Sequence, residues 1–177
     1  MSGDALLIID MQEGLLEEVS DAAAFTERVA AVRDLARKAG RPIVVIQHEA
    51  ADLVPGEPAW QLSTAIAPRE GDILVAKRNC DSFIGTDLDT LLHDLAVSRV
   101  VVTGLATEFC IDSTCRAALS RGFDLTLVAD GHSTPEPPPH SGLSAATIVA
   151  RYNQVLGWAD YPDRDVRVLA AADIAFD

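Results

Sequence analysis

Short runs of apolar residues that end at polar side chains constrain this chain more than any other feature. They are ALLII at 5–9, IVVI at 43–46, ILV at 73–75, VVV at 100–102, LTLV at 125–128 and VRVL at 166–169. Each run has the length of a buried strand, and helical spacing of apolar residues separates most of them. Apolar strands that alternate with helices are typical of a parallel sheet covered on both faces. We therefore predict an α/β fold: a three-layer, doubly wound (Rossmann-like), mainly parallel sheet of about six strands.

The helical segments carry their own start and stop signals. Residues 21–39 place Phe25, Val29, Val32 and Ala36 on one face, and Gly40 ends the pattern. Three further helices are expected at about 87–95, 110–121 and 143–156. With 177 residues and no internal repeat, the chain fits a single domain over residues 1–177.

Composition narrows the class of function. Hydrophobic residues make up 49% of the chain, so a packed core is expected rather than disorder. The net charge of −13, without any basic cluster, disfavours nucleic acid and anionic membranes as partners. No signal peptide or run of ~18 apolar residues is visible, which predicts a cytoplasmic protein. Three cysteines without a CxxC pair indicate neither disulfides nor zinc, and glycine-rich phosphate motifs are absent, so we expect no metal and no cofactor.

Polar residues stand where the predicted strands end. Ligands of open α/β sheets bind beyond the carboxyl ends of the strands, so these residues are candidates for one crevice. They are Asp10, Gln47, His48, Lys77, Cys110, Asp130 and His132.

Cys110 is the sharpest candidate in this set. It follows Thr107, a good N-cap residue, and opens a predicted helix whose N-terminus would lower the pKa of a thiol. The alternative is that Cys110 is an ordinary buried cysteine that packs as a small hydrophobe. Cys115 is expected to face the core, and Cys80 has no evident helper.

Asp10 and Lys77 form a plausible buried pair. Asp10 directly follows four apolar residues, where a carboxylate needs a partner, and Lys77 could supply it. With Cys110 they would make a base, a cation and a nucleophile. His48 offers a rival base in a Cys110–His48–Asp10 arrangement, or it is a partly buried polar residue at a strand end.

Two proline-containing loops, 50–69 and 131–142, are either functional segments that line a pocket for a small molecule or solvated surface excursions. Residues expected near such a pocket are His48, Trp60, Phe83, Glu108, Phe109 and His132. For each aromatic residue taken alone, ordinary core packing is the favoured interpretation. Trp60 could also reach the site of a neighbouring subunit, and His132 and His140 are expected at the pocket rim or the surface.

Three segments together resemble the isochorismatase-like cysteine hydrolases, which include nicotinamidases, N-carbamoylsarcosine amidases and isochorismatases. The segments are ALLIIDMQEG at 5–14, VAKRNCDSFIGTDLDTLL at 75–92 and VVVTGLATEFCIDSTCRAALSRGFDLTLVADGHST at 100–134. Their order and context match the family, and the resemblance runs from about residue 5 to residue 156.

The resemblance implies a role for each matched residue. Asp10 would be the general base, Lys77 its charge partner and Cys110 the nucleophile. The family has a non-proline cis peptide before its nucleophile, expected here at Ala106–Thr107. That bond would turn the N–H groups of Thr107 and Cys110 into an oxyanion hole. The family also implies a homodimer or larger homo-oligomer.

Two departures from the family patterns bear on the reaction. Nicotinamidases carry an Asp-x-His metal site where this chain reads Gln47-His48-Glu49-Ala50, so a metal-assisted nicotinamidase is disfavoured. Some isochorismatases lack the cysteine that this chain keeps. The leading hypothesis is cleavage of an amide or other C–N bond of a small molecule through a thioester. The alternatives are a vinyl-ether hydrolase that uses Asp10 as acid, and a catalytically idle binding protein.

Overall fold

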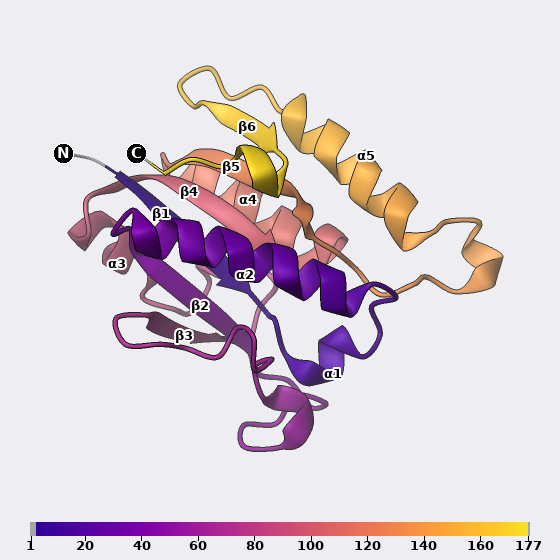
Figure 1. Ribbon diagram of the computed structural model, residues 1–177. Coiled ribbons are helices and arrows are strands. Elements are labelled where there is room, and N and C mark those ends of the chain that lie inside the picture. The colour runs from indigo at the N-terminus through magenta and orange to yellow at the C-terminus, as the bar shows by residue number, and fades with distance from the viewer. Residues whose placement is uncertain (1–2, 177) are drawn as a thin grey trace.

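The six strands found within residues 3–176 join one sheet in which every neighbouring pair runs parallel (Figure 1). The computed structural model describes residues 3–176. The strands are β1 (Gly3–Ile9), β2 (Ile43–His48), β3 (Ile73–Lys77), β4 (Val97–Gly104), β5 (Asp124–His132) and β6 (Val166–Leu169). Their order across the sheet is β3-β2-β1-β4-β5-β6, which confirms the predicted α/β architecture.

Helices cover both faces of this sheet (Figure 1). They are α1 (Glu13–Leu16), α2 (Ala22–Lys38), α3 (Leu88–Asp94), α4 (Asp112–Ser120) and α5 (Ala145–Gly157). Short 3₁₀ turns lie at Pro58–Trp60, Pro139–Ser141 and Ala171–Asp173, and a π-helical turn spans Thr107–Ile111. Within residues 3–176, no helix combines the length and the apolar character needed to cross a membrane.

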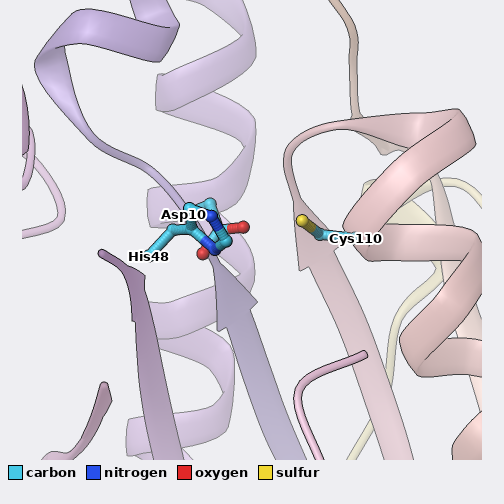
Figure 2. Close-up of side chains that lie close together, drawn as sticks. All are labelled: Asp10, His48 and Cys110. Carbon is cyan, nitrogen blue, oxygen red and sulfur yellow. The ribbon is translucent and has the colours of Figure 1, made fainter. Parts of the chain in front are cut away.

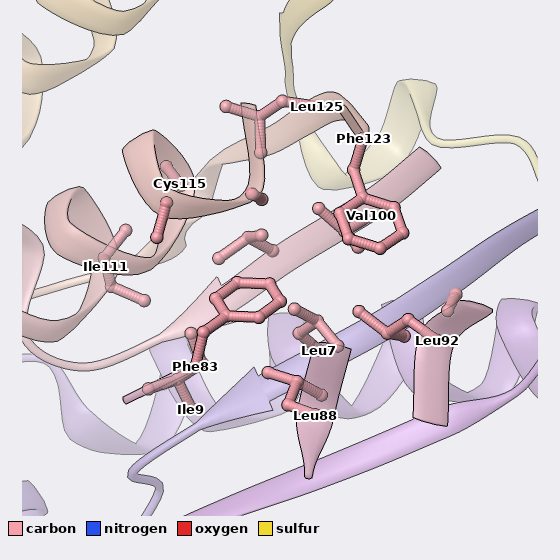
Figure 3. Packing of buried hydrophobic residues seen from close by; sticks show 14 of the residues in the cluster. Leu7, Ile9, Phe83, Leu88, Leu92, Val100, Ile111, Cys115, Phe123 and Leu125 are labelled. Carbon is pink, nitrogen blue, oxygen red and sulfur yellow. The ribbon is translucent and has the colours of Figure 1, made fainter. Parts of the chain in front are cut away.

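The alternation of side chains along β1 divides the core into two layers. Leu6 and Ile8 pack in one buried cluster with the apolar face of α2. Leu7 and Ile9 point the other way, into the cluster that holds residues of α3, α4 and α5 (Figure 3). A strand buried on both faces must be apolar at every position, which is why ALLII reads as a continuous run.

The order of the strands reverses at β1, which lies between β2 on one side and β4 on the other. In such sheets the ligand crevice lies at this switch point, beyond the carboxyl ends of the strands. Asp10 follows β1, and the π-helical turn with Cys110 follows β4. The topology therefore places the carboxylate and the thiol on the two sides of the switch point.

Gly104 permits the close approach of β4 to the end of β1. Its φ is +120°, and a Cβ atom there would lie 2.0 Å from the carbonyl oxygen of Ile9. The next residue, Leu105, donates its N–H to that same carbonyl at 2.9 Å. Only glycine fits at this contact, which fixes where the chain that leads to Cys110 leaves the sheet.

Candidate active site

The ammonium group of Lys77 lies at the centre of a buried cluster. Its Nζ is 2.7 Å from Oδ2 of Asp10, 3.1 Å from Sγ of Cys110 and 2.9 Å from Nδ1 of His48. An ammonium has three hydrogens and no lone pair, so it donates one hydrogen to each partner. The structure thus brings together the three residues of the predicted triad and His48, and Figure 2 shows the three partners.

The backbone at Asp10 departs from the strand it follows. Its φ is +53°, in the left-handed region that aspartate tolerates better than most residues. The N–H of Asp10 still donates to the carbonyl of Ile46 at 2.9 Å, so the residue stays anchored to β2. Such a conformation costs of order 1–3 kcal/mol and clusters at functional sites.

Burial controls the protonation of the acid and the thiol. It raises the pKa of Asp10, and the nearby Lys77 opposes this rise. Burial also raises the pKa of Cys110, and the charge of Asp10 raises it further while Lys77 lowers it. The expectation that a helix N-terminus gives Cys110 a lowered pKa is therefore wrong for this resting state. Asp10, whose carboxylate lies within 4.8 Å of Sγ of Cys110, is the adjacent acceptor for the thiol proton.

His48 cannot serve as the base in this arrangement. Its Nδ1 lone pair accepts a hydrogen from Lys77, so in the neutral ring the other nitrogen carries the proton. Burial lowers the pKa of His48, and the charge of Lys77 lowers it further, which keeps the ring neutral. The geometry favours Asp10 over the rival Cys110–His48–Asp10 arrangement.

Gln12 holds the backbone of His48 and was not singled out in the sequence. Its side chain is fully buried, its Oε1 accepts the N–H of His48 at 2.8 Å, and its Nε2 donates to the His48 carbonyl at 3.0 Å. The same Nε2 donates to the carbonyl of Trp60 at 3.0 Å. The available signal was its position two residues after Asp10, beside a strand end.

The segment before Cys110 differs from the expectation in two details. The cis peptide is Leu105–Ala106, one bond earlier than the expected Ala106–Thr107. Ala106, not Thr107, precedes the first helical residue, and the turn is π-helical, with the Ile111 N–H donating to the Ala106 carbonyl at 3.1 Å. π-helical turns are frequent at functional sites.

Thr107 also departs from its expected role in an oxyanion hole. Its N–H donates to the carbonyl of Ser133 at 2.9 Å and is not free to hold an oxyanion in this structure. The physical reason is that the chain beyond β5 runs alongside the turn and supplies an acceptor. The N–H of Cys110 stays a prediction as an oxyanion donor.

A buried chain of hydrogen bonds connects the π-helical turn to α5. Oγ1 of Thr107 lies 2.8 Å from Nδ1 of His132, and Nε2 of His132 lies 2.9 Å from Oδ1 of Asn153. Nδ2 of Asn153 donates to the Ala129 carbonyl at 2.9 Å, which fixes the amide and makes Nε2 of His132 the donor. His132 is thus buried inside the fold, contrary to its expected place at the rim, because β5 extends to include it.

The remaining expected pocket residues fall into two groups. Phe83 is buried and stacks on Phe123 with ring centroids 6.2 Å apart, so it belongs to the core and not to a pocket wall (Figure 3). Phe109 is exposed, while Trp60 and Glu108 are half-buried. The indole N–H of Trp60 and Oε2 of Glu108 are buried atoms without a hydrogen-bond partner among the described residues. As substrate contacts these three residues stay predictions.

Asp10, His48 and Cys110 also offer potential metal ligands within 4.8 Å of one another. Lys77 already donates to all three, however, so its ammonium stands where a shared cation would bind. A second positive charge there would meet strong repulsion at low dielectric. The donor set therefore does not fit a metal ion while Lys77 keeps its charge.

The other two cysteines differ sharply in exposure. Cys80 is exposed, whereas Cys115 is fully buried and its pKa is raised by burial. Cys110 keeps 8% of its surface exposed. Cys115 thus packs in the core as predicted.

An all-parallel sheet whose switch point joins a buried thiol, a carboxylate and a lysine defines an α/β protein with a candidate active site at the carboxyl ends of its strands. Comparison with known proteins agrees: the model of the isochorismatase domain matches residues 4–160. The chain belongs to the isochorismatase-like hydrolase family. An isochorismatase of Pseudomonas putida KT2440 superposes with a TM-score of 0.87 at 29% identity, covering 97% of this chain and 89% of that one.

Relatives include named hydrolases. A streptothricin hydrolase of Streptomyces noursei is 32% identical over 162 residues, which cover 88% of this chain and 64% of the relative. A second streptothricin hydrolase from the same organism is 30% identical, and the alignment covers 63% of its length. The chain therefore spans less than two thirds of the length of each of these two relatives. A ureidoacrylate amidohydrolase of Stutzerimonas stutzeri is 27% identical, with 97% of this chain and 84% of the relative covered.

Proposed function

We propose that this protein is a cysteine hydrolase that cleaves an amide or other C–N bond of a small molecule through a thioester. The observation that carries this proposal is the ammonium of Lys77, which contacts both Oδ2 of Asp10 and Sγ of Cys110. A cation in that position stabilises negative charge on sulfur as it forms, and it keeps the carboxylate beside the thiol.

The reaction follows from these positions. Asp10 accepts the thiol proton while Sγ of Cys110 attacks the carbonyl carbon, and Lys77 stabilises the sulfur as charge develops. The C–N bond then breaks, and the proton on Asp10 passes to the leaving nitrogen. Water attacks the thioester, Asp10 accepts a proton from it, and the returning proton restores the thiol as the acid product leaves.

The relatives support the type of bond. The ureidoacrylate amidohydrolase is named for hydrolysis at a C–N bond, and it aligns with almost the whole chain. The streptothricin hydrolases add a natural product to the compounds worth testing. Primary amides, ureas, carbamoyl compounds, ureidoacrylate and streptothricin therefore form the first substrate panel.

Amine release from this panel tests the proposal. We expect Cys110→Ala and Asp10→Asn to abolish turnover, because one removes the nucleophile and the other the proton acceptor. Cys80→Ser is the matched control, since this cysteine is exposed, and it should keep the wild-type rate. Turnover at the wild-type rate in either site variant would contradict the assignment.

A second candidate rests on the position of Asp10, whose carboxyl group is buried directly after β1, where burial raises its pKa. A carboxyl group that holds its proton can act as the acid that cleaves a vinyl ether. In that reaction Cys110 is a bystander. Hydrolysis of a vinyl ether that survives Cys110→Ala would favour this candidate over the first.

A further inference from the structure

The position of Lys77 depends on a third acceptor besides the two reacting groups. Two of its hydrogens go to Asp10 and Cys110, and the third goes to Nδ1 of His48 at 2.9 Å. The Lys77 side chain is buried, so a hydrogen left without an acceptor there would find no bulk water to replace it. All three hydrogens of the ammonium between acid and thiol thus have an acceptor in this structure.

His48 is itself held in place from two directions. It pairs with Lys77 in the register of β2 and β3, so the two side chains leave neighbouring strands at the same level. The buried amide of Gln12 binds both its N–H and its carbonyl, at 2.8 and 3.0 Å. The backbone that carries the ring is thus held at both its N–H and its carbonyl, as a positioning group requires.

We propose that His48 is a positioning residue, which accepts the third hydrogen of Lys77 and so fixes the ammonium between Asp10 and Cys110. The proposal rests on the function proposed above, in which Lys77 stabilises charge on sulfur. It gives His48 neither the role of a base nor that of a direct substrate ligand. His48 acts on Cys110 only through Lys77.

The rate of Cys110 alkylation by iodoacetamide tests this role without any substrate. The Cys80→Ser background removes the exposed thiol, and peptide mass spectrometry locates the label. His48→Leu removes the acceptor, so the ammonium is less well placed, and we expect alkylation at a fixed pH to slow by about tenfold to a hundredfold. His48→Asn should restore most of the rate, because its Oδ1 can take the place of Nδ1 as an acceptor.

A double-mutant cycle separates positioning from every other role of His48. In a Lys77→Met background, His48→Leu should leave the alkylation rate unchanged, since no ammonium remains to be positioned. An equal slowing by His48→Leu in both backgrounds would overturn the proposal. So would the failure of His48→Asn to restore the rate.

Two controls keep these outcomes interpretable. His140→Asn changes an exposed histidine and should leave alkylation unaffected, and urea unfolding shows whether each variant stays folded. If His48→Leu is unfolded, His48→Ala removes the same acceptor with a smaller side chain, and the cycle with Lys77→Met is measured with that variant. Alkylation of Cys110 needs no turnover, so the two proposals can fail separately. If no compound of the substrate panel is hydrolysed, only the proposed function is contradicted. If the effects of His48→Leu and Lys77→Met on alkylation are independent, only the positioning role is contradicted.

Discussion

Lys77 has exchanged its hydration shell for three protein partners, Asp10, Cys110 and His48. This exchange explains why a thiol and a carboxylate can lie side by side in the core without an uncompensated charge. The single positive charge of Lys77 compensates the negative charge of the Asp10 carboxylate, and the Cys110 thiol is neutral while it keeps its proton. The same burial that raises the pKa of Cys110 makes its proton the one that catalysis must move.

The signs of the pKa effects at Cys110 can be tested directly. Asp10 raises the pKa of the thiol and Lys77 lowers it. Asp10→Asn should therefore shift the pH dependence of Cys110 alkylation to lower pH, while Lys77→Met should shift it to higher pH. Mass spectrometry of the Cys110 peptide from pH 6 to pH 10 measures both shifts. An upward shift in Asp10→Asn would show that the carboxylate does not govern the thiol.

At the scale of elements, the ends of β1 and β4 determine the distance between acid and nucleophile. Gly104 meets the backbone of Ile9, and Asp10 follows at once. The apolar runs were enough to predict both strands, because a strand buried on both faces must be apolar throughout. The contact between them was not predictable, since it depends on which strands become neighbours.

Gly104→Ala should destabilise the fold more than a comparable glycine change elsewhere. Gly122 also has a positive φ, +95°, but a Cβ there meets nothing within 4 Å. We expect Gly122→Ala to cost about 1–2 kcal/mol from backbone conformation alone, and Gly104→Ala to cost about 1–3 kcal/mol more from the clash with Ile9. Urea unfolding of both variants measures the difference. Equal losses would contradict the close contact.

The π-helical turn depends on the buried chain of hydrogen bonds that runs from Thr107 through His132 to Asn153 of α5. Thr107→Val removes the hydroxyl beside Nδ1 of His132 while keeping the shape, and we expect a loss of about 1–3 kcal/mol in unfolding free energy. Asn153→Leu breaks the other end of the chain. If the chain acts as one unit, the double variant should lose less than the sum of the two. Additive losses in urea unfolding would show two independent contacts.

At the scale of the whole molecule, the sequence predicted the parallel sheet and placed Asp10, Lys77 and Cys110 at its carboxyl edge. The expectations that failed depend on contacts between distant segments. The N–H of Thr107 found an acceptor beyond β5, and Phe83 lies against Phe123 in the core, the packing favoured for each aromatic residue taken alone, and not at the pocket. Neither contact leaves a pattern in its own stretch of sequence. The expected homo-oligomer stays a prediction, which light scattering can check.

Buried His132 should make stability depend on pH. Burial lowers its pKa, so its contribution to stability is complete above the unfolded value of about 6.5 and is lost as pH falls toward the folded value. His132→Gln should be less stable than wild type at pH 7.5. The difference in unfolding free energy between wild type and His132→Gln should narrow below pH 6.5, by up to about 1.4 kcal/mol per pH unit. A gap in urea unfolding that stays constant down to pH 5 would contradict this assignment.

The covalent role of Cys110 is tested most directly by rapid quenching of wild-type protein on a hydrolysed member of the substrate panel. Peptide mass spectrometry then shows which residue carries the acyl group. We predict an adduct on Cys110 whose mass equals the acyl part without its amine, and no adduct or turnover in Cys110→Ala. Hydrolysis that continues in Cys110→Ala, with no adduct on the wild-type peptide, would contradict a thioester mechanism.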